Sequence, residues 1–169
     1  MLHYNKSKVT FYNQLESTDC GAACLAMIIS YYGKKIALSQ VKKQFDFTRI
    51  GVSIQDITKV ASKIGLQTTP LKLTQEQLEE IPLPSILFWK QDHFVVLEKI
   101  TYKNKKNKYH ILDPAYGKII LEKDIFIKEW QGNNEKGVGI VFQETEEFKN
   151  FKWQEESKKA ILKSPSFIT

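Results

Sequence analysis

Hydrophobic positions are densest near the N-terminus, where the 14 residues from Cys20 to Gly33 include neither a charge nor a proline. A helix over about 20–32 would be apolar around most of its circumference, which predicts a central helix buried on nearly all sides. Asp19 precedes it as the expected N-cap, and Gly33 is a typical residue after a helix end. The segment is too short to cross a bilayer, so we expect no direct insertion of this chain into a membrane.

Helical spacing continues in three shorter segments. The first has Ser39 as its expected N-cap and runs to about Phe45, and the second is capped by Ser53. The third starts after Thr74, has Gln77 in a capping-box arrangement and ends near residue 80. The second segment carries an apolar stripe made of Ile54, Ile57, Val60, Ala61 and Ile64.

The second half of the chain changes to the period of strands. Five strands separated by turn residues are predicted over Ser85–Trp89, His93–Ile100, Lys108–Asp113, Gly117–Leu121 and Val138–Gln143. A short helix over Lys123–Trp130 is expected between the last two. Helices followed by an antiparallel sheet are typical of the α+β class, so we expect an N-terminal helical half packed on a C-terminal antiparallel β-sheet.

Length and composition fit one domain with a tail. The chain has 169 residues, of which 42% are hydrophobic and 26% are charged, as in ordinary globular proteins. These values exclude disordered, collagen-like and coiled-coil proteins. Because the sequence turns polar and rich in Lys and Glu near its end, we predict a domain over residues 1–147 and a polar linker or tail over residues 148–169.

The net charge of +6 does not make this a nucleic-acid-binding protein. Of the 25 basic residues only Arg49 is an arginine, the side chain best suited to phosphate and guanine contacts. We therefore expect a solvated lysine surface and no nucleic-acid partner. The two cysteines lie one helical turn apart and form no disulfide framework, which predicts reduced thiols and a cytoplasmic setting. The N-terminus also lacks the apolar region of a signal peptide.

Cys20 carries the strongest local signal for chemistry because it opens the central helix. A thiol in the first turn faces the positive end of the helix macrodipole, which favours the thiolate. A nucleophilic cysteine also needs an imidazole partner, and without one Cys20 is more simply a packed core thiol. Asp19 beside it would oppose thiolate formation, so we expect Asp19 to act as the helix cap.

Three other residues complete a candidate catalytic set. His93 begins an apolar strand and so lies at the mouth of the sheet, and Asp113 ends a strand before Pro114. A carboxylate in this position can orient an imidazole. Gln14 lies six residues before Cys20, where its amide and the cysteine N–H can stabilise an oxyanion. Each has a plainer interpretation, as a core histidine, a turn aspartate and a surface glutamine.

Strand parity removes most of the other candidates. His110 and Asp113 point to opposite faces of a regular strand, so they should not serve one site. Asp92 adjoins His93 and would point away from it. His3 lies in a terminus that we expect to be frayed.

Two alternatives based on the cysteines stay open. A zinc site would use Cys20, Cys24, His93 and His110, and a thioredoxin-like redox pair would use the two cysteines alone. The three residues between the cysteines and the strand parity of the two histidines make the zinc site less favourable. A redox pair usually has two residues between its cysteines, and here there are three.

The candidate residues belong to a larger set of motifs. These are Gln14-x-Glu16-x-x-Asp19-Cys20-Gly21-x-Ala23-Cys24, Tyr32-Gly33, Pro84-x-Ile86-x-x-Trp89-x-x-x-His93-Phe94-Val95-Val96-Leu97, Asp113-Pro114-x-x-Gly117 and Trp130-x-Gly132. From about residue 10 to 145 the sequence closely resembles the bacteriocin-processing cysteine peptidase domain, a double-glycine leader peptidase, of peptidase-containing ABC transporters.

The resemblance implies a papain-like fold and cleavage of a leader peptide after a double-glycine motif, coupled to export by an ABC transporter. By position it makes Cys20 the nucleophile, His93 the general base and acid, Asp113 the orienting carboxylate and Gln14 the oxyanion donor. It implies no cofactor and no metal in this domain. The expected partners are the leader peptide and, in a full-length protein, transmembrane and nucleotide-binding domains, where ATP would act. The domain would then lie on the cytoplasmic side of a bacterial membrane.

The resemblance also raises a rival function. Related transporters of large protein toxins carry a degenerate domain that lacks the nucleophile and only binds cargo, and the presence of Cys20 argues against it here. No G-x-x-x-x-G-K-[ST] pattern occurs in the sequence, and its basic end favours a domain excised from a transporter over a free-standing peptidase. A leader helix is expected to bind an apolar groove, for which Ile54 and Ile57 are candidates that core packing explains equally well.

Overall fold

The computed structural model describes residues 8–46 and 51–154. Its helical elements are η1 (Ser17–Asp19), α1 (Cys20–Tyr31), α2 (Leu38–Lys42), α3 (Ile54–Lys63), α4 (Gln75–Leu78), α5 (Lys123–Gln131) and α6 (Glu146–Asn150). Its strands are β1 (Gln67–Leu73), β2 (Ser85–Trp89), β3 (His93–Lys103), β4 (Lys106–Asp113), β5 (Gly117–Glu122) and β6 (Gly137–Gln143). The predicted α+β class is confirmed.

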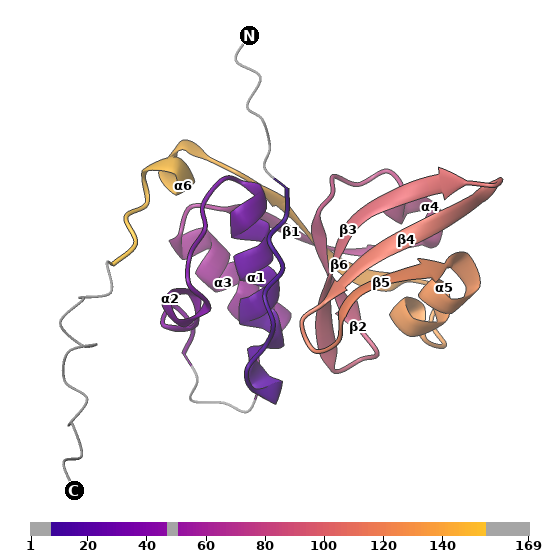
Figure 1. The fold of residues 1–169 in the computed structure, drawn as a ribbon, viewed down its shortest axis with the longest axis horizontal. Helices are drawn as coiled ribbons and strands as arrows, with labels where there is room; N and C mark the ends of the chain where they lie inside the picture. The colour runs from indigo at the N-terminus through magenta and orange to yellow at the C-terminus, as the bar shows by residue number, and fades with distance from the viewer. Residues whose placement is uncertain (1–7, 47–50, 155–169) are drawn as a thin grey trace, which may run out of the picture.

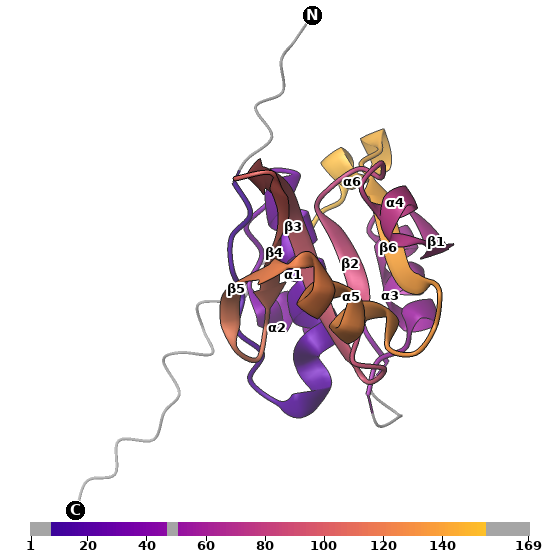
Figure 2. The same ribbon diagram turned by 90° about the vertical axis from the view of Figure 1, so that its right-hand side faces the viewer.

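The strands form one antiparallel sheet in the order β1-β6-β2-β3-β4-β5. Helices α1, α2 and α3 lie on one side of this sheet, and α4 and α5 lie on the other (Figure 1). Figure 2 looks onto the second side, with α5 in front of the sheet and α1 behind it. Among the described residues no helix combines the length and the apolarity needed to span a membrane.

The sheet separates two apolar cores, as the alternation of side chains along a strand requires. On β3, Phe94 and Val96 join the core under the helices α1–α3, whereas Val95 and Leu97 join the core under α5. Every residue of α1 from Cys20 to Ser30 is buried, which confirms the prediction of a central helix.

The helix starts were predicted with mixed success. Ser53 accepts a hydrogen bond from the Asp56 N–H, and Thr74 accepts one from the Gln77 N–H, so both expected caps are present. Helix α2, however, begins one residue before Ser39, which lies inside it and is not its cap. Asp19 occupies the N-cap position of α1, but its side chain makes no capping hydrogen bond to that helix. The prediction of its role as a cap is therefore wrong.

Three elements were not predicted, namely the short η1, strand β1 and helix α6. Strand β1 contains Pro70, which lacks an N–H and is tolerated because β1 is the edge strand and pairs with β6 alone. Helix α6 lies where the tail was expected to begin, and its Phe148 is fully buried while Phe151 and Trp153 pack on the same core. Packing therefore continues beyond the predicted boundary at residue 147. Residues 155–169 of the predicted tail, and His3, lie outside the described residues.

The segment before η1 connects the helical half to the sheet. Its Thr10 N–H donates a hydrogen bond to Ser30 Oγ of α1 at 2.9 Å. Further along, the Gln14 N–H donates to the carbonyl oxygen of Pro114 at 2.9 Å. The second bond fixes Gln14 beside the β4–β5 turn, directly after Asp113.

Candidate active site

Cys20 is the first residue of α1, and only 7% of it is exposed. The next residue, Gly21, lies tightly against the loop before α3. A Cβ atom added to Gly21 would come within 2.9 Å of Val52 Cγ1, closer than such atoms normally approach. Glycine at position 21 therefore lets the start of α1 lie against Val52 and fixes where the cysteine is held.

His93 is the first residue of β3, after a tight turn from β2 in which Trp89 pairs with His93. Lys90 and Gln91 in this turn have positive φ angles of 49° and 64°, which are unfavourable for residues other than glycine. The turn is held against α5, because the Lys90 N–H donates to the Glu129 carbonyl oxygen at 3.0 Å and the two side chains form an ion pair at 3.6 Å. Strained backbone of this kind persists where the surroundings fix it, and here it sets the position of the imidazole.

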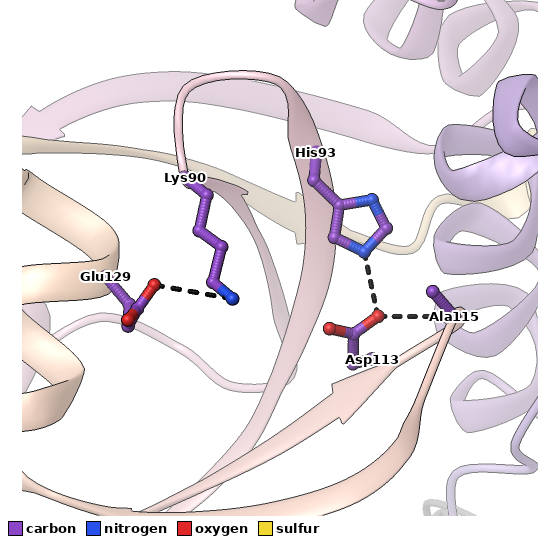
Figure 3. A network of polar contacts seen from close by, with 5 residues as sticks. All are labelled: Lys90, His93, Asp113, Ala115 and Glu129. Carbon is purple, nitrogen blue, oxygen red and sulfur yellow. Dashed lines mark hydrogen bonds and ion pairs between the residues drawn. The ribbon is translucent and has the colours of Figure 1, made fainter.

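Asp113 is the last residue of β4, and its carboxylate is directed at His93 (Figure 3). Its Oδ1 accepts a hydrogen bond from His93 Nε2 at 2.8 Å and another from the Ala115 N–H at 2.9 Å. Figure 3 shows the second ring nitrogen of His93 turned away from Asp113. Since Nε2 is occupied by the carboxylate, Nδ1 is the nitrogen left for another partner.

Cys20 is the other group that acts on this imidazole, and its interaction with His93 contributes to the pKa of the ring. Burial alone would lower the pKa of His93. The hydrogen bonds to Asp113 and Cys20, together with the negative charges of both groups, outweigh burial and raise the pKa of His93 to about 9. The structure thus brings Cys20 from the helical half into interaction with His93 of the sheet, which is bonded to Asp113.

The pKa values of the Asp113 carboxyl and the Cys24 thiol are shifted in opposite directions. Burial favours the neutral form of Asp113, but the hydrogen bonds from His93 and from the Ala115 N–H prevail and lower the pKa of its carboxyl. Cys24 is fully buried, and burial together with the nearby charges of Cys20 and Asp113 raises the pKa of its thiol well above the usual value. Only one of the two cysteines is therefore placed beside a base.

Gln14 lies at the same end of the molecule through its backbone bond to Pro114. Its side-chain Oε1 is buried and accepts no hydrogen bond from the described residues. Through this oxygen, therefore, the Gln14 side chain makes no hydrogen bond that stabilises the fold.

Other residues considered from the sequence lie elsewhere. His110 Nε2 is hydrogen-bonded to Thr101 Oγ1 at 2.8 Å, consistent with the predicted difference in face between His110 and Asp113. Within residues 8–46 and 51–154, no three or more His, Cys, Asp or Glu side chains are grouped as metal ligands. This arrangement gives no support to the zinc alternative.

Two features of the site gave no signal in the sequence. Lys90 and Gln91 are not typical turn residues, so nothing marked their strained conformation or the charge of Lys90, which helps to lower the pKa of Asp113. The ion pair between Asp19 and Lys42 joins residues far apart in the chain and depends on how α2 packs on α1. Lys42 could be recognised as the partner of Asp19 only once the fold was known.

Comparison with known proteins gives one consistent result. The family model of the peptidase C39 family matches residues 8–134. Over 127 residues the chain is 33% identical to a probable microcin-H47 secretion/processing ATP-binding protein of Escherichia coli, covering 75% of this chain and 18% of that protein. Over 110 residues it is 36% identical to a colicin V secretion/processing ATP-binding protein of the same organism, covering 65% of this chain and 15% of that protein. The chain thus spans less than a fifth of the length of these relatives.

Solved structures agree. A double glycine motif protease from an AMS/PCAT transporter, in complex with the leader peptide, matches with a TM-score of 0.71 and 31% identity, covering 85% of this chain and 97% of that one. The peptidase domain of Streptococcus ComA matches in fold, with a TM-score of 0.68 and 21% identity, covering 82% and 100%. These likenesses confirm the predicted papain-like fold, in which a helical half carries the cysteine and a sheet carries the histidine and aspartate. This chain belongs to the peptidase C39 family.

Proposed function

We propose that this chain is a cysteine endopeptidase that cleaves leader peptides after a double-glycine motif. The observation that carries the proposal is the position of His93, which is bonded through Nε2 to Asp113 and also interacts with Cys20. The relatives named as processing proteins for microcin H47 and colicin V support the substrate class. So does the similarity to a double glycine motif protease bound to a leader peptide.

In the first half of the reaction, the Cys20 thiolate attacks the carbonyl carbon of the second leader glycine and a C–S bond forms. The Gln14 amide and the Cys20 N–H stabilise the oxyanion. His93, protonated at neutral pH because its pKa is about 9, gives its Nδ1 proton to the leaving amine as the C–N bond breaks. The product peptide departs and leaves a thioester between the leader and Cys20.

In the second half, His93 acts as a base. It takes a proton from water, whose oxygen attacks the thioester carbon, and the C–S bond then breaks to release the leader carboxylate. Asp113 holds the ring in one orientation throughout and stabilises its charged form. The sulfur and imidazole return to their starting state, so the cycle uses only side chains of this chain and water, with no cofactor or metal.

The preference for glycine fits a narrow approach to the nucleophile. At Gly21 an added Cβ would already be too close to Val52, and glycine residues in a substrate likewise permit a close approach. The leader would bind as an amphipathic helix. Of the two candidate groove residues, Ile57 is fully buried and belongs to the core, whereas Ile54 lines a surface cavity of about 590 Å³ together with Val52, Phe88 and Phe94.

We also propose that this chain is one domain of a longer protein that exports the peptide and uses ATP. Because the relatives that match this chain are named as ATP-binding secretion proteins and are much longer, we propose that the domain works beside transmembrane and nucleotide-binding domains. ATP would act in the latter. The peptidase would then face the cytoplasm, where the precursor peptides are made.

The test is to incubate the chain with a synthetic precursor peptide that contains a Gly-Gly site and to identify the products by mass spectrometry. We expect one cut after the second glycine, and no cut with Cys20→Ala, which should still bind the leader. A precursor in which Ala-Ala replaces Gly-Gly is the matched control. Leader binding without any cleavage by the unmodified chain would favour the cargo-binding alternative and overturn the peptidase.

A further inference from the structure

Asp19 is a buried carboxylate directly before the nucleophile, and only 1% of it is exposed. Its Oδ2 accepts a hydrogen bond from the Glu16 N–H at 3.1 Å, which closes the turn of η1. Lys42, from α2, places its Nζ 3.0 Å from each carboxylate oxygen and donates a hydrogen bond to Oδ2. Three segments that are separate in the sequence therefore meet at this carboxylate.

The charge of Asp19 is unfavourable for the proposed chemistry. A carboxylate one residue from Cys20 repels both the thiolate and the oxyanion that forms on the substrate, and repulsion is strongest where solvent is excluded. The carboxylate also makes no capping bond to the N–H groups at the start of α1, so it does not offset this cost by completing that helix. A compensating positive charge is what such a buried group requires.

We propose that Lys42 is a positioning residue for the reaction: its ammonium neutralises Asp19, so that the η1 turn is held by a carboxylate without a net negative charge beside the nucleophile. The inference rests on the proposed function and adds to it a residue from outside the Gln14, Cys20, His93 and Asp113 set. It also explains how a buried Asp can precede a nucleophilic Cys. Asp19 closes the η1 turn by accepting the hydrogen bond from the Glu16 N–H, and Lys42 cancels the repulsion between Asp19 and the thiolate.

A purely structural ion pair would behave differently. Loss of such a pair lowers stability, and adding a second change that removes the other charge need not restore turnover. If Lys42 acts by neutralising charge, Lys42→Met should lower kcat by about 10- to 100-fold and leave KM nearly unchanged. Lys42→Arg keeps the charge and should retain kcat. The double variant Asp19→Asn/Lys42→Met removes both charges, keeps an oxygen for the Glu16 N–H and should recover most of kcat.

The experiment measures kcat and KM on a double-glycine peptide for these variants, with melting temperatures to confirm folding. Lys43→Met is the matched control, because Lys43 is the exposed neighbour of Lys42 and should be without effect. A folded Lys42→Met variant with the kcat of the unmodified chain overturns the proposal, as does a double variant no faster than Lys42→Met. If Lys42→Met does not fold, Lys42→Arg and the double variant carry the test, and a loss of kcat in either one overturns it.

A second readout separates this inference from the proposed function. Iodoacetamide reacts with the Cys20 thiolate without any substrate peptide, and the modified residue is identified by mass spectrometry. At a fixed pH the rate should be lower in Lys42→Met and recovered in the double variant. If the unmodified chain cleaves no double-glycine peptide, the proposed function fails while these alkylation rates still decide the role of Lys42. Equal alkylation rates in all variants contradict that role.

Discussion

His93 Nε2 and Asp113 Oδ1 lie 2.8 Å apart and join the start of β3 to the end of β4. The register explains the contact. Val96 pairs with Leu112, so the next step of the ladder brings Val95 opposite Asp113 and makes His93 its diagonal neighbour on the same face. The sheet itself therefore sets the orientation of the imidazole, while α1 supplies the sulfur.

Asp113→Asn should lower kcat by less than Cys20→Ala or His93→Ala. The Asn Oδ1 can still accept the proton of His93 Nε2, and Cys-His-Asn is a working arrangement in papain-like proteases. The loss should therefore stay below the roughly 10⁴-fold caused by the same change in a serine protease, where the wrong tautomer results. Initial rates on a Gly-Gly peptide test this, and an inactive but folded Asp113→Asn variant would show that the negative charge is indispensable.

Gln14→Ala should lower kcat by about 10²–10³-fold, the usual cost of removing one oxyanion donor. KM should change little, because the donor acts when charge develops on the carbonyl oxygen. Gln14→Glu serves as a second variant, since it keeps the size of the side chain and removes the amide donor. The segment itself should stay in place through the backbone bond from the Gln14 N–H to Pro114. An increase in KM alone would assign Gln14 to substrate binding instead.

The two cysteines should differ in reactivity. Iodoacetamide at neutral pH should modify Cys20, which contacts His93, and spare Cys24, which is fully buried with a raised thiol pKa. Cys24→Ala should leave cleavage intact and reduce stability by about 1 kcal/mol, as expected for a small cavity in a core. Peptide mapping after alkylation and a denaturant titration measure both effects. A folded but inactive Cys24→Ala variant would challenge the choice of nucleophile.

Most of the site could be predicted because its residues stand at the ends of elements that the sequence marks clearly. Cys20 opens an apolar helix, His93 opens an apolar strand and Asp113 precedes a proline that ends one. These local patterns predict the structure well, because the apolar residues that mark the elements in the sequence are also the ones that bury α1 and pair β3 with β4. The sequence identified the candidate residues and the strand face on which each lies. The register between β3 and β4 then brings His93 and Asp113 together.

The parts that were missed depend on packing between distant segments. Asp19 looked like a helix cap because its type and position fit, but Lys42 from α2 and the Glu16 N–H compete for its carboxylate. Strand β1 was hidden by Pro70, which only an edge position tolerates. Helix α6 was hidden by its polar composition, since its contribution to the core comes mainly from one residue, Phe148.

Stability should fall as the pH rises from about 6.5 to 9. The pKa of His93 is raised to about 9 in the folded protein, so its contribution is fully present below the unfolded value of 6.5 and is lost as the pH passes the folded value. The loss is at most about 3 kcal/mol, and solvent around the half-buried ring reduces it. Denaturant titrations across this range measure the decline. The His93→Gln variant should lose much of this pH dependence of stability. An unchanged decline in that variant would show that other groups cause it.

The acidic side should show the opposite dependence. Because the pKa of Asp113 is lowered by its hydrogen bonds, its contribution is present above the ordinary carboxyl pKa and is lost as the pH falls through the lower folded value. Asp113→Asn should remove this part of the acid-induced loss of stability while the loss above pH 6.5 becomes smaller, since His93 then lacks a negative partner.

Gly21→Ala should reduce activity by moving the start of α1. The added Cβ would meet Val52 Cγ1 at 2.9 Å and Val52 Cβ at 3.2 Å, and a branched side chain cannot turn both atoms away. The helix start must then shift by a few tenths of an ångström, which changes the distance between the Cys20 sulfur and the imidazole. Because catalysis is sensitive to small misplacements of reacting groups, we expect a loss of kcat of about 10-fold or more.

Val52→Ala provides the matched control for this effect. The shorter side chain removes the Cγ atom that meets the new Cβ, so the double variant Gly21→Ala/Val52→Ala should recover much of the kcat lost in Gly21→Ala. Val52→Ala alone measures the separate contribution of Val52 to the cavity beside α3, where any effect should appear in KM. A double variant as slow as Gly21→Ala would mean that the bare backbone of Gly21, and not the space beside it, is what the reaction requires.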